Sequence, residues 1–256
     1  MGIYERSADM KTNVVFMINI EHDERSKSQQ YQWSIKAWEH YAKKHDAELF
    51  VLDQPLADIE YMAPQWYKTF VFELLEQSGI DYDQILYVDS DTMPHPDTPN
   101  VFEISERKFC AVQNYGSMDW VCRSLENYSK YVFDGFTFPY WKYFNSGMFI
   151  INDDHKQMFS DMINFYKDNR DTLVQIQTQL GVGKDQPVLN FFVQKSGVEY
   201  KQLPYEFNMQ DLPRFEIIGE DMIFTKFGWI YHFNCGVRPS PGAYLKRTYD
   251  YFYGDK

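Results

Sequence analysis

The first ninety residues alternate between short apolar segments and segments with the spacing of amphipathic helices. Apolar runs at 13–20, 48–52 and 85–88 have the length and the β-prone residues of buried strands. The segments between them carry apolar residues three and four positions apart, as one face of a helix requires: Tyr31, Ile35, Trp38 and Ala42, then Tyr67, Phe70, Val71, Leu74 and Leu75. This alternation predicts a mostly parallel sheet with helices on its faces.

Later segments extend the pattern less regularly. Further strands are expected at 108–112, 147–151, 222–225 and 229–231, and helices around 158–166 and from Asp185 onward. No repeat, low-complexity stretch or long linker divides the 256 residues, a length that suits one substantial core. We therefore predict a single Rossmann-like α/β domain over 1–256, with 1–12 as a loose N-terminal tail.

Composition excludes several classes of partner. The net charge of −12 disfavours a nucleic-acid backbone or an anionic bilayer, and no apolar run reaches the roughly eighteen residues of a membrane span. Cys110, Cys122 and Cys235 are too widely spaced for a disulfide framework or a zinc cluster. Because the N-terminus also lacks a signal-peptide pattern, we expect a cytoplasmic protein. Nothing in the sequence indicates an oligomeric state.

Two carboxylates follow the apolar run at 85–88. Asp89 and Asp91 are two positions apart, so in extended backbone their side chains point the same way and can converge on one ligand. Adjacent negative charges repel unless a positive group lies between them, and a divalent cation backed by a phosphate meets that need. The structural alternative is a strand end followed by an Asx turn, which is the commoner origin of such a pair on its own.

Other polar residues are expected at the same edge of the sheet. Ligands of an open α/β sheet gather at the carboxyl ends of its strands, so Asn19, which follows the first strand, should face the same crevice as the carboxylate pair. In the segment 143–147, Asn145 and Ser146 supply short hydrogen-bonding groups directly before a strand. An ordinary turn before a strand accounts for that segment equally well.

Two later segments supply further candidates. In 181–187, Asp185 and Gln186 are placed to lie beneath a substrate; helix initiation is the structural alternative, and the glycine and lysine spacing is not that of a phosphate loop. His232 ends a late strand and can bind a metal through neutral imidazole, although a lone histidine is more often structural. Arg238 can hold a phosphate through charge-assisted hydrogen bonds.

Together, four segments resemble the retaining glycosyltransferases of the GT-A fold. In chain order they are ILYVDSDT, YFNSGMFIIN, KDQPVLN and YHFNCGVRP. The closest resemblance is to the glycogenin and lipopolysaccharide galactosyltransferase family, and it runs from 13 to 239. It implies a GT-A-type domain, a divalent metal (Mn²⁺ or Mg²⁺) and a nucleotide-sugar donor, with uridine diphosphate (UDP) as the expected nucleotide.

By this resemblance, the carboxylate pair is a metal-binding DxD motif. Asp91 would bind the ion directly, Asp89 would bind it and also reach the ribose, and His232 would be the third protein ligand. Asn19 would lie beside the nucleotide and Lys68 near the donor. These five residues are the expected metal and donor-binding set.

The resemblance also assigns residues to the transferred sugar. Asn145 and Ser146 would lie near that sugar, and Asp185 and Gln186 match the family's Asp-Gln pair beside the anomeric centre. Asp185, Gln186 and Asn145 are therefore the candidate catalytic residues, and Ser146 is a donor-binding candidate. Asp185 would either stabilise the positively charged transition state or attack the anomeric carbon, and both routes stay open.

One segment departs from the family pattern. Arg238 stands where the family usually has a diphosphate-binding lysine. The glycine that the family has three residues after the histidine is replaced by Cys235, and Gly236 follows one position later. The phosphate-binding loop is therefore expected to differ in shape, which weakens the assignment of Arg238.

The resulting expectation is a metal-dependent hexosyltransferase that acts with retention on a UDP-sugar. Its acceptor would be a hydroxyl of a glycan, a lipid-linked sugar or a protein. A sugar-phosphate nucleotidyltransferase is one alternative, but it needs a glycine-rich basic loop after the first strand, which 17–21 does not provide. A non-catalytic carbohydrate- or nucleotide-binding module is the other, since aromatic residues make up 18% of the chain.

Overall fold

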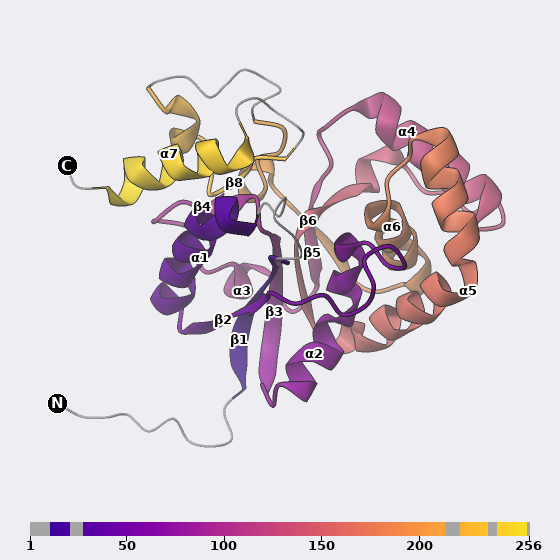
Figure 1. Cartoon of the computed structure of the whole chain (residues 1–256), viewed down its shortest axis with the longest axis horizontal. Helices are drawn as coiled ribbons and strands as arrows, with labels where there is room; N and C mark the ends of the chain where they lie inside the picture. Colours follow the sequence, from indigo (N-terminus) through magenta and orange to yellow (C-terminus); the bar gives the residue numbers. More distant parts are fainter. Residues whose placement is uncertain (1–10, 21–27, 213–220, 235–239, 255–256) are drawn as a thin grey trace.

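A six-stranded sheet forms the centre of the computed structural model, which describes residues 11–20, 28–212, 221–234 and 240–254 (Figure 1). The strand order is β2-β1-β3-β6-β5-β7. The strands are β1 (Thr12–Ile18), β2 (Ala47–Leu52), β3 (Tyr82–Asp89), β5 (Phe109–Gln113), β6 (Phe144–Asn152) and β7 (Tyr200–Leu203). Neighbouring strands are parallel except at β6, which runs antiparallel to β3 and β5. The predicted mostly parallel α/β sheet is confirmed.

Helices flank this sheet (Figure 1). The α-helices are α1 (Gln32–Lys44), α2 (Val71–Gln77), α3 (Val101–Ile104), α4 (Met118–Tyr131), α5 (Lys156–Leu180), α6 (Asp185–Ser196) and α7 (Pro241–Tyr253). The 3₁₀ helices are η1 (Ser28–Tyr31), η2 (Pro64–Phe70), η3 (Tyr140–Lys142), η4 (Asp153–His155), η5 (Tyr205–Phe207) and η6 (Ile223–Lys226). Within the described ranges, no helix has both the length and the apolar character needed to cross a membrane.

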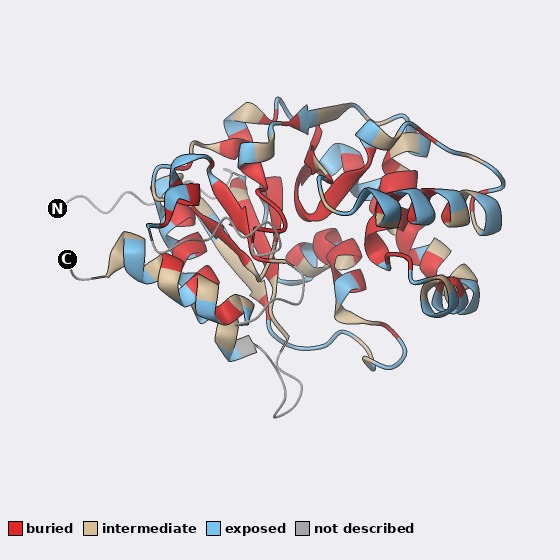
Figure 2. Cartoon of the chain, turned by 90° about the horizontal axis from the view of Figure 1, so that it is seen from above, coloured by how far each residue is buried: buried red, intermediate tan, exposed pale blue. Residues whose placement is uncertain are grey.

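The central strands send alternate side chains into two separate cores. Val14 and Phe16 of β1 pack with residues of η2, α2, α5 and α6 in one cluster. Val15 and Met17 pack with Trp38 of α1 and with α3 in the other. Figure 2 shows much of the sheet in red and the outer sides of many helices in pale blue. Burial on both faces explains why the central strands are continuously apolar in sequence.

The direction of β6 determines which residues reach the end of β3. Because the two strands are antiparallel, the first residues of β6 lie beside the carboxyl end of β3. Asn145 and Ser146 belong to β6 itself, which begins at Phe144, whereas the sequence pattern predicted a turn there and a strand from 147. These two residues therefore come next to the carboxylate pair.

A second, two-stranded sheet brings the C-terminal part of the chain to the same place. β4 (Thr92–Pro94) pairs with β8 (Ile230–His232) in antiparallel register, and Thr92 lies opposite His232. Trp38 Nε1 donates a hydrogen bond to Thr92 Oγ1 at 3.0 Å, which ties β4 to α1. His232 thereby comes beside Asp91, the residue that precedes β4.

One predicted strand is wrong. The segment expected as a strand at 222–225 contains the start of the 3₁₀ helix η6. Met222 has a left-handed φ of 52°, and Thr225 Oγ1 donates to the Met222 carbonyl at 2.7 Å, which closes a tight turn. Phe224 and Met222 are buried there in a cluster with α7, so burial rather than a strand accounts for the apolar run.

Some element boundaries were also missed. β1 begins at Thr12, whose N–H donates to the Asp81 carbonyl at 3.0 Å, so the predicted loose tail overlaps the strand by one residue.

The helices α4 and α7 were not predicted, because Ser124 and Thr248 lie on their buried faces and interrupt the apolar period. Strand β7 was missed as well, and its four residues are mostly polar.

Candidate active site

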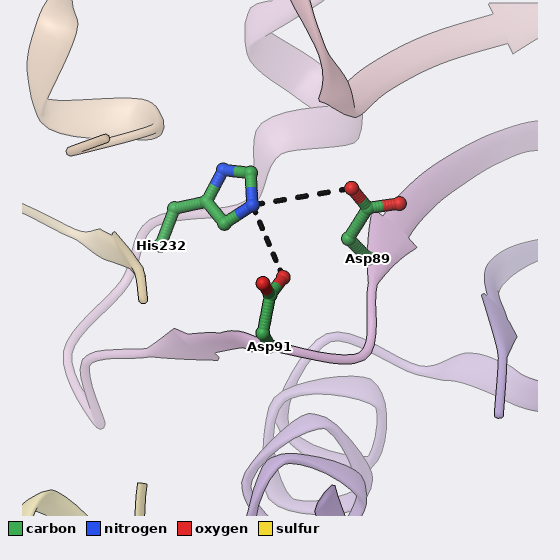
Figure 3. Close-up of side chains that lie close together, drawn as sticks. All are labelled: Asp89, Asp91 and His232. Atoms are coloured by element: carbon green, nitrogen blue, oxygen red, sulfur yellow. Dashed lines mark ion pairs between the residues drawn. The ribbon is translucent and has the colours of Figure 1, made fainter. Parts of the chain in front are cut away.

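Asp89, Asp91 and His232 come together at the carboxyl end of β3 (Figure 3). His232 Nε2 lies 3.1 Å from Asp91 Oδ1 and 3.9 Å from Asp89 Oδ2. One possible ligand atom from each residue lies within 4.8 Å of the other two. The predicted cluster thus forms, and the β4–β8 pairing is what joins its two distant sequence segments.

These side chains can hold a divalent cation. Ligand atoms about 2.1 Å from one ion lie about 3 to 4 Å from each other, and the two ion-pair separations fall in that interval. Asp91 Oδ1 is buried and faces His232 Nε2 at 3.1 Å, as two ligand atoms of one ion would. Two carboxylates with one imidazole fit Mn²⁺ or Mg²⁺ better than zinc.

Electrostatics set the charge of His232. Burial lowers the pKa of this imidazole, but Asp91 and Asp89 outweigh burial, so the pKa of His232 is raised above its usual 6.5. The protein without metal therefore favours a histidine cation between two carboxylates. A bound metal ion would replace that proton, because only the unprotonated nitrogen is a ligand.

Lys68 lies buried in η2 between two carboxylates. Its Nζ is 2.9 Å from Asp185 Oδ2 and 3.5 Å from Asp89 Oδ1, and it donates to the Ser146 carbonyl at 3.1 Å. The same ammonium lies 4.6 Å from the centre of the Tyr87 ring. Burial lowers the pKa of Lys68, but Asp185 and Asp89 outweigh it, so that pKa is raised. Lys68 is a fixed cation that links the metal-binding cluster to Asp185.

Asp185 is the first residue of α6, but its carboxylate does not cap the helix. The N-cap residue is Lys184, and no side chain caps the helix through a hydrogen bond. Ser146 Oγ donates to Asp185 Oδ2 at 3.1 Å, and the Ser146 N–H donates to Gln186 Oε1 at 3.0 Å. Helix initiation therefore does not account for Asp185, whose charge faces Lys68.

Gln186, the residue after Asp185, is part of the lining of a pocket of about 500 Å³. Asn145 lines it from β6, Gln186 from α6 and Trp120 from α4. Asp211, whose side chain is buried, also lines it. Amides, a carboxylate and one large ring are the groups expected around a small polar ligand.

The hydrogen bonds of Asn145 restrict what this residue can do in the pocket. Its Oδ1 accepts from the Gly147 N–H at 2.9 Å and from Asn208 Nδ2 at 3.0 Å. Its Nδ2 donates to Asn114 Oδ1 at 3.4 Å, a long contact. The oxygen is thus used twice inside the protein, and the amide nitrogen is the atom better placed to serve a ligand.

Asn19 and Arg238 are the remaining residues that the sequence predicted for the site. Asn19 follows β1, and its N–H donates to the Leu52 carbonyl at 2.9 Å. Since Ile18 pairs with Asp89 across β1 and β3, Asn19 lies at the same sheet edge as the metal cluster. Arg238 lies outside the described residues.

Tyr87 and Asn208 contact the side chains of the metal cluster but were not found from the sequence. Tyr87 donates its hydroxyl hydrogen to Asp89 Oδ1 at 2.6 Å. Its position two residues before Asp89 in a strand was an available signal, because such residues share a face. Asn208, whose Oδ1 lies 3.0 Å from His232 Nδ1, follows η5 in a segment without periodicity, and no sequence pattern marks it.

No protein-family model matches this sequence, and no curated protein is significantly similar to it. Solved structures are similar. A glycosyltransferase involved in the glycosylation of the major capsid of PBCV-1 has a TM-score of 0.60 and 12% identity, with 92% of this chain and 99% of that chain covered. Mouse xyloside xylosyltransferase 1 has a TM-score of 0.50 and 12% identity, and the match covers 88% of this chain and 98% of that chain. The chain has the same fold as these two enzymes. This agrees with the GT-A-type α/β architecture predicted from the sequence.

Proposed function

We propose that this chain is a metal-dependent glycosyltransferase that moves a hexosyl group from a UDP-sugar to a hydroxyl, with retention of anomeric configuration. The observation that carries the proposal is the position of Lys68. This buried cation lies within 3.5 Å of Asp89, a residue of the metal-binding cluster, and within 2.9 Å of Asp185. Transfer from a nucleotide-sugar needs a metal site for the diphosphate and, next to it, a carboxylate for the anomeric carbon. The Asp89 cluster and Asp185 would meet these two needs.

Asp89, Asp91 and His232 would hold Mn²⁺ or Mg²⁺. The ion would supply Lewis-acid stabilisation of the departing diphosphate. Asn19 would lie against the nucleotide, and Arg238 would bind the diphosphate from the segment after β8. Asp89 would also contact the ribose, as in the family of glycogenin and the lipopolysaccharide galactosyltransferases, to which we propose that this chain belongs.

Asp185 would act on the sugar. Both of its described contacts, with Lys68 and with Ser146 Oγ, involve Oδ2. Oδ1 would therefore face the anomeric carbon and either stabilise its positive charge or attack it. The Lys68 ammonium, 2.9 Å from Oδ2, holds the carboxylate in position beside the sugar for either route.

The 500 Å³ pocket that Gln186 and Asn145 line is large enough for a sugar residue. Gln186 and the amide nitrogen of Asn145 would hydrogen-bond the hydroxyls of the transferred sugar, and Ser146 would hold Asp185 in place. The acceptor would present its hydroxyl from a glycan, a lipid-linked sugar or a protein. A single-domain organisation over 1–256 and a cytoplasmic location are part of the same proposal.

An enzyme is favoured over a binding module by the cost of the buried charges. Lys68 is 2% exposed and Asp185 is 6% exposed. Burying an ion pair often costs as much as its attraction returns. A module that only binds a neutral glycan gains nothing from such a pair.

A nucleotidyltransferase is disfavoured because 17–21 lacks the basic, glycine-rich character that a triphosphate needs.

Titration calorimetry with UDP tests the metal-dependent nucleotide site. We expect UDP to bind the wild-type chain much more tightly with Mn²⁺ than without it, and Asp91→Ala to lose this metal dependence. Asp97→Ala removes an exposed carboxylate outside the cluster and should behave like wild type. Equal UDP affinity with and without Mn²⁺ in the wild type would contradict the proposal.

A further inference from the structure

We propose that Asn208 is a positioning residue that presents His232 to the metal and, with the same amide, holds Asn145 in the wall of the pocket. The inference rests on the proposed function, because the metal is part of it. Asn208 is fully buried. Its Oδ1 lies 3.0 Å from His232 Nδ1, and its Nδ2 donates to Asn145 Oδ1 at 3.0 Å.

The surrounding hydrogen bonds determine which end of each amide faces which neighbour. Asn145 Oδ1 accepts the Gly147 N–H, so this atom must be the oxygen. The atom of Asn208 that faces it must then be the nitrogen, which leaves Asn208 Oδ1 facing the imidazole. A carbonyl oxygen only accepts, so His232 Nδ1 carries the hydrogen.

This arrangement directs the other ring nitrogen to the metal site. With Nδ1 protonated, the lone pair of neutral His232 is on Nε2, the atom that faces Asp89 and Asp91 in Figure 3. Partners of this kind, which hold the non-ligating nitrogen of a metal-binding histidine, fix its tautomer and its ring orientation. Asn208 would therefore fix the tautomer and the ring orientation that His232 needs in order to bind the ion.

Backbone hydrogen bonds hold Asn208 beside the strand that carries His232. The next residue, Met209, donates its N–H to the Ile230 carbonyl at 2.8 Å and accepts the His232 N–H at 2.9 Å. The segment after η5 is thus tied to β8 on both sides of Tyr231. These bonds fix the backbone next to Asn208 against β8, so the amide is carried to the side of His232.

Mn²⁺ binding measured by calorimetry, with no sugar donor present, tests this role. We expect Asn208→Ala to weaken Mn²⁺ binding about 10- to 100-fold, the range typical for such partners of metal ligands. The matched control is Asn152→Ala, which removes a buried asparagine at the opposite end of β6. It should lower thermal stability and leave Mn²⁺ affinity unchanged. Wild-type Mn²⁺ affinity in a folded Asn208→Ala protein would overturn the inference.

Nitrogen NMR of the imidazole in the metal-free chain separates this inference from the proposed function. The signals of His232 are assigned by their loss in His232→Gln. At a pH at which the imidazole is neutral, we expect a protonated Nδ1 that exchanges slowly with water in the wild type and rapidly in Asn208→Ala. An unprotonated Nδ1 in the wild type, or equal exchange in both proteins, would overturn the role of Asn208. A wild type that binds no Mn²⁺ would contradict the proposed function, while the NMR result would still decide the role of Asn208.

Discussion

Asp89 is the residue that joins the two halves of the site. Its Oδ1 accepts the Tyr87 hydroxyl hydrogen at 2.6 Å and lies 3.5 Å from Lys68 Nζ, and its Oδ2 lies 3.9 Å from His232 Nε2. One carboxylate thus lies near His232 on one side and near Lys68, the cation paired with Asp185, on the other. A change at Asp89 should disturb both metal binding and sugar chemistry.

The charge of His232 makes the stability of the metal-free chain depend on pH. Its pKa is raised in the folded state, so the protonated form stabilises the fold. This stabilisation is fully present at pH values below the unfolded-state pKa of about 6.5. That contribution is lost as pH rises through the folded pKa. In urea unfolding with EDTA, the stability difference between wild type and His232→Asn should therefore be largest near about pH 6 and shrink toward about pH 9.

The matched comparison for that measurement is His40→Asn, which replaces an exposed histidine of α1. A His232→Asn difference that stays constant, or grows with pH, would contradict a histidine cation held by the two aspartates.

At the level of elements, the strands β1, β2, β3, β5 and β6 were predictable from the sequence, and the place where the site residues meet was less so. Asp89 and Asp91 could be found because they follow a buried strand at a spacing of two. Lys68 was named only through the family resemblance, since a lysine beside an apolar helical face is expected in solvent rather than buried. Asn208 could not be found at all, because its role depends on the tertiary pairing of its loop with β8.

The fit of β6 against the metal cluster depends on Gly147. A Cβ at this position would overlap the His232 ring and lie 2.8 Å from Asp89 Oδ2. We therefore expect Gly147→Ala to displace both ligands and to weaken Mn²⁺ binding at least about tenfold, as loss of ligand geometry does elsewhere. Calorimetry with Mn²⁺ measures this directly.

Gly242→Ala provides the control for that substitution. Its Cβ would meet Gln30 between α7 and η1, and the three atoms nearest to it all belong to Gln30 and none to the metal cluster. It should lower thermal stability and preserve Mn²⁺ affinity. If Gly147→Ala binds Mn²⁺ like wild type, the close approach of β6 to the cluster has no role in metal binding.

At the level of the whole molecule, the site depends on the topology of the sheet. β3 ends beside the start of the antiparallel β6. η2 places Lys68 beside Asp89 at the end of β3 and beside Asp185, the first residue of α6. The β4–β8 pair adds His232 from the far end of the chain. The chain carries a net charge of −12, so binding an anionic nucleotide-sugar requires the local cations of this site.

The central claim is that Asp185 acts on a sugar whose diphosphate is held at the Asp89, Asp91 and His232 cluster. The most direct measurement is release of UDP from a panel of UDP-sugars in Mn²⁺, compared between wild type and Asp185→Asn. We expect turnover of at least one donor by the wild type and a loss of at least about 100-fold in Asp185→Asn, with Mn²⁺-dependent UDP binding retained. Wild-type turnover by Asp185→Asn would contradict the account.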